Sequence, residues 1–151
     1  MPHREASTVI RAPIERVYAY LCDLPRMPEW CAPVVEARWI RQTPQMVDSR
    51  ALMVMRVAGE PIPSEIVVLK ADPPRYLSAR ALSGVMGTYT WKLESAPEGT
   101  RVTRIIDWAI PPTILGREID ALWFERTQSR TIDQDLDNVK AVLEHRPDEG
   151  S

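Results

Sequence analysis

Histidine is scarce in this chain of 151 residues: only His3 and His145 are present, and both lie close to an end. A catalytic histidine, or a metal site built on imidazole, needs its ring inside the fold. The long stretch between these two residues supplies none. The sequence therefore argues against Cys-His nucleophile pairs, Ser-His-Asp triads and iron sites with two histidines. We expect no metal ion and no organic cofactor.

Cysteine and long apolar runs are lacking as well. Cys22 and Cys31 are the two cysteines, and their spacing is neither that of a CxxC redox pair nor that of a structural zinc site. We expect both to be reduced, in a cytoplasmic protein. The first residues contain no apolar segment of the kind that a secretory signal carries. No apolar run approaches the roughly 18 residues of a membrane-spanning helix, so we expect no membrane insertion.

Excess charge of one sign is the third absence. The formal net charge is −2, and no cluster of lysine and arginine stands out. We therefore expect no nucleic-acid partner and no anchor on an anionic membrane. The hydrophobic fraction of 44% and the charged fraction of 26% are ordinary for a globular protein. This length predicts one domain over residues 1–146 and a disordered tail over 147–151, in a chain that could form a homodimer.

The spacing of apolar residues, with a period of two in strands and about 3.6 in helices, predicts the order of the elements. They are a strand, two short helices, six further strands and one long helix. Consecutive strands joined by tight turns form an antiparallel sheet, and a long amphipathic helix is the natural cover for its apolar face. The fold class is therefore α+β. The expected strands are 5–11, 34–41, 49–58, 64–71, 76–82, 86–95 and 100–110, and the expected helices open at Pro13, cover 25–31 and cover 113–144.

Period-two alternation also assigns side chains to strand faces. In the last two strands it groups several aromatic residues with one arginine. The expected sets are Val35, Ala37 and Trp39; Tyr89, Trp91 and Leu93; and Val102, Arg104, Ile106 and Trp108.

The order of these elements resembles the START-like superfamily, also called SRPBCC, and within it the polyketide cyclase/dehydrase type. Three segments carry the resemblance. They are residues 7–30, with an Ala-Pro helix start and the run Pro28-Glu29-Trp30; GTRVT at 99–103; and ILGREIDALWF at 114–124. The resemblance implies a helix-grip fold, in which a curved antiparallel sheet of about seven strands, two short helices and a long C-terminal helix enclose a cavity.

The same resemblance implies a function: binding of a small hydrophobic molecule and cyclisation or dehydration of a polyketide-like ketone, a lyase-type reaction. Bacterial aromatase/cyclases of this family position their substrate with arginine, tyrosine and tryptophan side chains. Where those enzymes carry a polar run in the fourth strand, this chain reads Ile66-Val67-Val68-Leu69. That difference favours a smaller or more apolar ligand.

Arg104 and Tyr89 are the candidate catalytic residues. If the face that Arg104 shares with Val102 is inward, its guanidinium group enters the cavity, where it needs a carboxylate partner or an anionic ligand. A bulge in the strand, or a side chain that extends past the sheet edge, is the alternative. The phenol of Tyr89 could donate a proton to a carbonyl oxygen.

The candidate ligand-binding residues are large, planar or adaptable side chains and two further arginines, for which an exposed position is the alternative. Aromatic rings could stack on a flat ligand, although core packing is the simpler role for any one of them. Trp123 could form a lip at the cavity mouth or a dimer contact, and Trp30 is expected to pack between the short helices. The set is Trp39, Met55, Arg56, Arg80, Trp91, Trp108, Leu122 and Trp123.

Two other functions compete with the enzyme. A carrier or sensor for a lipid, quinone or isoprenoid would suit the apolar fourth strand and the lack of a clear acid/base pair. An interaction domain with a collapsed cavity would need a distinctive surface patch, and the sequence shows none. Fold alone does not choose among them.

Overall fold

Seven strands form one antiparallel sheet, which a computed structural model describes together with its helices over residues 3–57, 59–84, 86–108 and 121–145. The strand order is β1-β7-β6-β5-β4-β3-β2, so β1 and β2 are the edges. The elements are β1 (His3–Ile10), α1 (Ile14–Cys22), η1 (Leu24–Arg26), α2 (Met27–Trp30), β2 (Val34–Arg41), β3 (Arg50–Val57), β4 (Glu60–Asp72), β5 (Tyr76–Ala81), β6 (Gly87–Ala96), β7 (Gly99–Trp108) and α3 (Ala121–His145).

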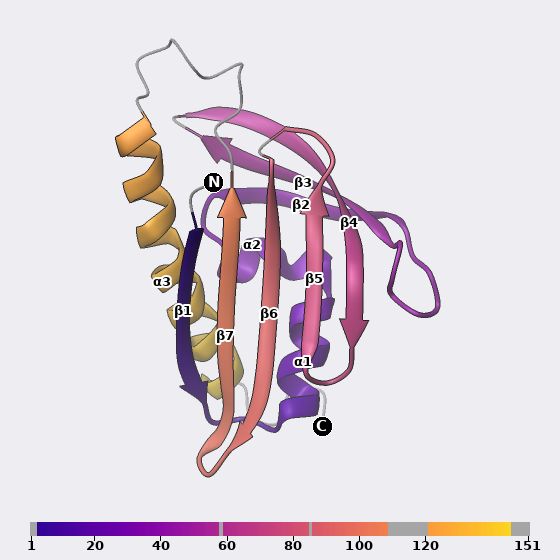
Figure 1. The fold of residues 1–151 in the computed structure, drawn as a ribbon, viewed down its shortest axis with the longest axis vertical. Helices are drawn as coiled ribbons and strands as arrows, with labels where there is room; N and C mark the ends of the chain where they lie inside the picture. Colours follow the sequence, from indigo (N-terminus) through magenta and orange to yellow (C-terminus); the bar gives the residue numbers. More distant parts are fainter. Residues whose placement is uncertain (1–2, 58, 85, 109–120, 146–151) are drawn as a thin grey trace.

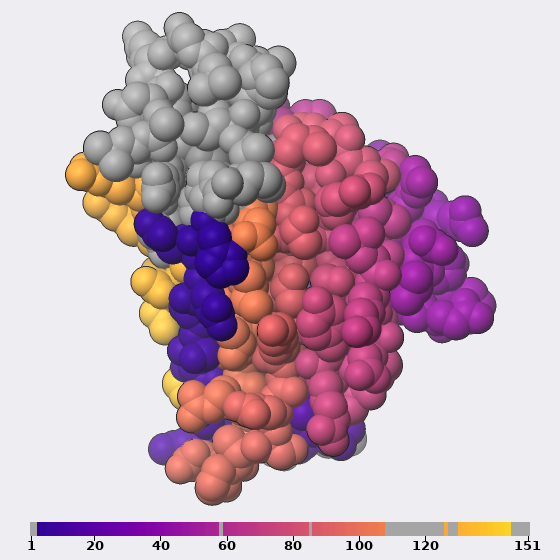
Figure 2. All heavy atoms as spheres, viewed as in Figure 1, coloured from indigo at the N-terminus to yellow at the C-terminus, as the bar shows by residue number. Residues whose placement is uncertain are grey.

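The sheet and the helices form two layers (Figure 1). The helices of the described segments all lie on one side of the sheet, and β2 and β3 cross behind the upper ends of the other strands, so the sheet is strongly bent. The opposite side is a surface built from strands (Figure 2). This arrangement follows from the alternation of each strand, because a sheet with one apolar face buries that face and leaves the other in water. The fold class predicted from the sequence is confirmed.

The apolar stripe of α3 forms part of the hydrophobic core, together with residues of the sheet and of α1. Ile132, Leu136, Val139 and Leu143, which share one helical face, are all buried. Helix α1 contributes the buried side chains of Val17, Tyr18, Tyr20 and Leu21 in the same way. Among the described helices, none is long and apolar enough to cross a membrane.

Most element boundaries agree with the sequence prediction to within two residues. Strand β4 is the exception, because it begins at Glu60 rather than at residue 64 and includes Pro61 and Pro63. The short helix predicted over 25–31 is a 3-10 turn followed by one α-helical turn. The predicted start of the long helix at residue 113 and the predicted tail at 147–151 lie outside the described residues.

A β-bulge in β2 explains one wrong assignment. Val34 pairs with Met55 and Glu36 pairs with Val54, so the register shifts between them. A bulge inserts one extra residue and reverses the faces beyond it. Val34 is therefore buried and Val35 is exposed, whereas Ala37 and Trp39 pack half-buried against the core. The expectation that Val35 shares a face with Ala37 and Trp39 is wrong for this reason.

The hairpin between β6 and β7 holds the end of β1 in place. Ala96 pairs with Gly99 across the turn. Gly99 has φ +146°, and a Cβ atom there would collide with the carbonyl oxygen of Ile10. Thr100 adds a hydrogen bond of 2.8 Å from its hydroxyl to the carbonyl oxygen of Ala12. Glycine at position 99 thus permits the close approach of the two chain segments.

Candidate functional site

A cavity of about 50 Å³ lies between the concave face of the sheet and the short helices. Its walls are almost wholly apolar, because strands β3 to β6 and the segment from α1 to α2 present aliphatic, sulfur-containing and aromatic side chains. Among the described lining residues, one side chain carries a fixed charge, and it belongs to β7. The lining residues are Leu21, Leu24, Met27, Trp30, Cys31, Met53, Met55, Ile66, Leu77, Ala79, Tyr89, Trp91 and Arg104.

Arg104 points inward from β7, as strand parity predicts, and is 5% exposed. Its guanidinium carbon lies 4.4 Å from the centre of the Trp91 ring and 4.9 Å from that of Trp30. The two indole rings meet edge to face, with centres 5.4 Å apart and planes at 78°. Cation–π attraction is strongest where water is excluded. The two rings therefore hold the charge of Arg104 at a defined place in the cavity wall.

Asp135, from α3, is the charged neighbour of Arg104. It is 1% exposed, and its Oδ2 lies 3.5 Å from Nε of Arg104. Within the described part of the chain, neither carboxylate oxygen of Asp135 nor Nε of Arg104 has a nitrogen or oxygen hydrogen-bond partner, and the Cys31 thiol is the weak donor near Asp135. Burial raises the pKa of the Asp135 carboxyl to about 6, against opposing effects of the Arg104 charge and the Cys31 thiol. The ion pair therefore only partly offsets the cost of removing the carboxylate from water.

The raised pKa of Asp135 predicts an unusual pH dependence of stability. Between its ordinary pKa of 3.8 and about 6, the folded protein holds a proton that the unfolded chain releases. The contribution of Asp135 to the free energy of unfolding should therefore fall by about 2–3 kcal/mol as the pH rises through this window. Urea unfolding of the wild-type protein and of Asp135→Asn at several pH values isolates this contribution as their difference. The free energy of unfolding of the wild type minus that of the variant should fall as the pH rises, and a value that rises with pH would contradict the prediction.

Tyr89 and Cys31 complete the polar part of the cavity wall. Removal from water raises the pKa of the Tyr89 hydroxyl to about 12, although the Arg104 charge opposes the shift. Burial also raises the pKa of the Cys31 thiol, and the Asp135 charge adds to the effect. Both groups are therefore protonated at neutral pH. Tyr89 can donate a hydrogen bond to a ligand oxygen, whereas Cys31 is a poor nucleophile.

The sequence prediction did not include Asp135 in the site, and it assigned Trp30 a packing role alone. Asp135 lies three residues after Ile132 and one before Leu136, so it stands on the buried face of α3. That helical spacing is a signal that could have identified it. Trp30 was expected to pack between the short helices; it does contact that region, but it also lines the cavity and stacks on Arg104.

Two predicted ligand-binding arginines face away from the cavity. Arg80 is exposed on β5, where Leu77, Ala79 and Ala81 take the inward positions. Arg56 is exposed on β3 and donates a hydrogen bond of 3.2 Å to the carbonyl oxygen of Gly59. A guanidinium group is far less costly in water than in an apolar wall. The prediction that Arg80 and Arg56 bind a ligand in this cavity is wrong.

The other predicted residues divide into three groups. Met55 and Trp91 line the cavity, as Tyr89 and Arg104 do. Trp39 packs against the core from β2 and is absent from the described cavity wall. The side chains of a third group lie outside the described part of the structure, namely those of Trp108, Leu122 and Trp123.

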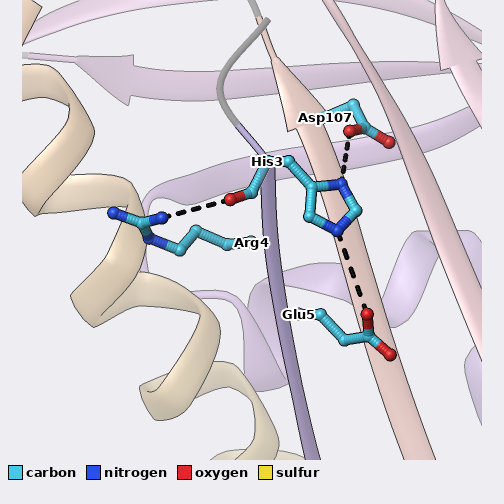
Figure 3. Close-up of polar contacts among 4 residues, drawn as sticks. All are labelled: His3, Arg4, Glu5 and Asp107. Atoms are coloured by element: carbon cyan, nitrogen blue, oxygen red, sulfur yellow. Dashed lines mark hydrogen bonds and ion pairs between the residues drawn. The ribbon is translucent and has the colours of Figure 1, made fainter.

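Asp107, the acidic residue of β7, belongs to a polar cluster at the edge of the sheet (Figure 3). Nδ1 of His3 is 2.6 Å from Oδ1 of Asp107, and its Nε2 is 3.9 Å from Oε2 of Glu5. The side chains of all three are 37–56% exposed. Asp107 is thus partly exposed on the face of β7 opposite to that of Arg104. Solvent screening makes such pairs weak, and they stand apart from the cavity.

Comparison with known proteins identifies a family and a set of similar solved structures. A family model described as polyketide cyclase/dehydrase and lipid transport matches residues 1–144. None of the curated proteins matches the chain in sequence.

Among solved structures, the aromatase/cyclase Zhui from Streptomyces sp. R1128 is 19% identical, with a TM-score of 0.81 over 99% of this chain and 98% of that one. A START superfamily protein from Mycobacterium smegmatis is 10% identical, with a TM-score of 0.79 over 95% and 97% of the two chains. The di-domain aromatase/cyclase StfQ of the steffimycin pathway is 19% identical, with a TM-score of 0.74. That match covers 97% of this chain, which spans about half (52%) of StfQ. At these identities the likeness concerns the fold.

Proposed function

This chain belongs to the polyketide cyclase/dehydrase and lipid transport family, and from that premise we propose that it binds a small ketone-bearing molecule in its cavity and promotes its cyclisation and dehydration. The observation that carries the proposal is the placement of Arg104. A single guanidinium group, fixed between two indole rings, stands in an otherwise apolar wall. Such a group can stabilise the negative oxygen that develops when a ketone forms an enolate.

The apolar wall supports this chemistry by holding the substrate. A polyketone reacts with itself once a carbon next to one carbonyl group is brought close to a second carbonyl carbon, so a catalyst gains much of its effect from conformation. A carbon next to a carbonyl group, such as the terminal methyl carbon of a methyl ketone, loses a proton to solvent and gives an enolate. The enolate then attacks a second carbonyl carbon, a carbon–carbon bond forms, and loss of water follows.

Tyr89 would assist the same step. Its raised pKa of about 12 keeps the hydroxyl protonated at neutral pH. A protonated phenol can donate a hydrogen bond to the carbonyl oxygen under attack and supply its proton as the alkoxide forms. In this assignment Arg104 stabilises the enolate oxygen, Tyr89 acts on the attacked carbonyl, and Met55 and Trp91 shape the cavity.

Heptane-2,4,6-trione provides a direct test. Attack of its terminal methyl carbon on the distant carbonyl, followed by loss of one water, gives 5-methylresorcinol. Attack by oxygen with loss of water gives 2,6-dimethyl-4-pyrone instead. We expect the protein to accelerate the formation of the carbocycle over the rate in buffer, as measured by chromatography of both products.

Tyr89→Phe is the matched variant, because it removes one hydroxyl and keeps the ring. We expect it to lower the rate of carbocycle formation by roughly 10²-fold, the lower range for the loss of a general acid. A product ratio and rate equal to those in buffer, with wild-type protein present, would overturn the catalytic proposal.

A non-catalytic carrier or sensor for a lipid, quinone or isoprenoid is the second candidate. The apolar character of the cavity wall and the three consecutive buried residues Ile66, Val67 and Val68 favour it. A carrier would bind the triketone without changing its rate of reaction. Saturable quenching of tryptophan fluorescence by the triketone, with no acceleration, would therefore favour this second function.

A further inference from the structure

We propose that Arg104 and Asp135 together form a site for a small carboxylate-bearing molecule, and that Asp135 takes up one proton when this acid binds. The inference rests on the proposed function, because it assigns a class of ligand to the same cavity. It starts from the two carboxylate oxygens of Asp135, which are buried without a nitrogen or oxygen hydrogen-bond partner among the described residues, the Cys31 thiol being the weak donor beside them. Buried polar atoms in this state are rare and need an explanation.

The guanidinium group of Arg104 is incompletely paired with the carboxylate of Asp135. Arg104 and Asp135 approach at 3.5 Å through Nε and Oδ2, which is longer than a charge-assisted hydrogen bond. The two carboxylate oxygens and the guanidinium group therefore do not form the bidentate pair that arginine and a carboxylate prefer. Because Arg104 also lines the cavity, a second carboxylate that arrives from the cavity side can compete for its charge.

The surroundings of Asp135 determine its charge before and after a ligand binds. Arg104 from β7 and the Cys31 thiol, directly after α2, are the groups that act on its ionisation. Arg104 and Cys31 also act on the ionisation of the Tyr89 hydroxyl, from β6. Without a ligand the pKa of Asp135 is about 6, so the carboxyl is largely ionised at pH 7 but close to protonation. A second negative charge nearby raises this pKa further.

Uptake of one proton keeps the charge of the buried group balanced. Before binding, the charges are those of the guanidinium group and the Asp135 carboxylate. After binding, they are those of the guanidinium group and the ligand carboxylate, and Asp135 is neutral. Two buried carboxylates that share one cation would otherwise repel each other strongly. Asp135 is not among the described lining residues, so it responds to the ligand through Arg104, whose Nε lies 3.5 Å from its Oδ2.

The rest of the wall limits the ligand to a small acid with an apolar body. The cavity volume of about 50 Å³ is below the roughly 150 Å³ of an apolar cavity that holds benzene. Met27, Met53 and Met55 can change rotamer and enlarge the space at modest cost. Butyrate and benzoate are therefore suitable probes, and butyramide and benzamide are their neutral controls of matched shape.

Isothermal titration of the full chain with these four compounds at pH 7 tests the proposal. Measurement in phosphate and in Tris, which differ in ionisation enthalpy, gives the number of protons exchanged on binding. We expect the acids to bind more tightly than their amides, with an uptake approaching one proton per acid. The apparent Kd should rise with pH between 6 and 8, by up to about tenfold per unit.

Two variants assign the proton and the charge. Asp135→Asn should keep the preference for acids and lose the proton uptake, and Arg104→Gln should lose the preference for acids over amides. The pH dependence of wild-type binding needs no variant, so the proposal stays testable if either substitution disturbs folding.

The outcomes separate the acid site from the proposed cyclisation. Equal affinity for acids and amides, or acid binding without proton uptake, overturns the acid site. If the protein still accelerates triketone cyclisation in that case, the proposed function stands. If it binds the acids with proton uptake but does not act on the triketone, the acid site stands and the cyclisation proposal fails.

Discussion

Arg104→Leu is expected to lower the free energy of unfolding at pH 7 by about 3–5 kcal/mol, because it leaves the carboxyl of Asp135 buried without a cation. The substitution also removes the fixed charge of the cavity, so carbocycle formation from the triketone should fall to the rate in buffer. Urea unfolding measures the first effect and product chromatography the second. Both measurements are needed, because a loss of activity alone would follow from unfolding.

The double variant Arg104→Leu/Asp135→Leu separates the two effects. Replacement of a whole buried ion pair by apolar residues of similar volume is often neutral or stabilising. We therefore expect the double variant to recover most of the lost stability and to remain inactive. A single variant that is as stable as the wild type would show that Asp135 finds another partner. A double variant with wild-type activity would remove Arg104 from the proposed mechanism.

Trp30→Ala is expected to destabilise the protein by a similar amount, about 3–5 kcal/mol, and to widen the range of ligands that the cavity accepts. Trp30 is 3% exposed, and its ring contacts both Trp91 and the guanidinium group of Arg104. Truncation removes those contacts and joins the volume of an indole ring to the cavity. Chemical denaturation gives the loss of stability, and titration with benzoate and the larger 1-naphthoate gives the change in ligand size.

Trp39→Ala is the matched control, since Trp39 is a half-buried tryptophan on the edge strand β2 and is not part of the described cavity wall. It should cost less stability and leave the ligand preference unchanged. An equal gain in 1-naphthoate affinity in both variants would mean that the effect comes from general loosening. That result would not identify Trp30 as the lining residue that limits ligand size.

The sheet could be predicted from the sequence because alternation and turn residues act locally. The parity of β7 placed Arg104 inward together with Val102 and Ile106, and all three are buried. The antiparallel order of β2 to β7 followed from their short connections, whereas the pairing of β1 with β7 joins distant segments and was not predicted. Parity fails where the backbone departs from regular pairing, as the bulge beside Val35 shows, since a single extra residue reverses every face beyond it.

The candidate site was harder to predict, because its contacts join distant segments. The ion pair links Arg104 on β7 to Asp135 on α3. The spacing of residues within one strand or one helix does not indicate that these two side chains are in contact. Trp30 comes from a third segment. Conversely, Arg80 lies on a strand where Ser78 and Ala79 are both buried, so composition alone did not show which face was inward. Exposure of Arg56 and Arg80 became evident only from the packing of the whole sheet.

The end of α3 has a consequence for how copies of this protein avoid one another. Nζ of Lys140 donates a 2.7 Å hydrogen bond to the carbonyl oxygen of Val9, and Oε2 of Glu144 accepts one of 2.8 Å from the backbone N–H of Arg11. These bonds occupy backbone groups at the end of edge strand β1, which a strand of another chain would otherwise use. At the other edge, the bulged strand β2 carries the exposed charges of Glu36 and Arg38. Aggregation by strand addition is thus opposed at both edges, by a helix at one and by bulges and charge at the other.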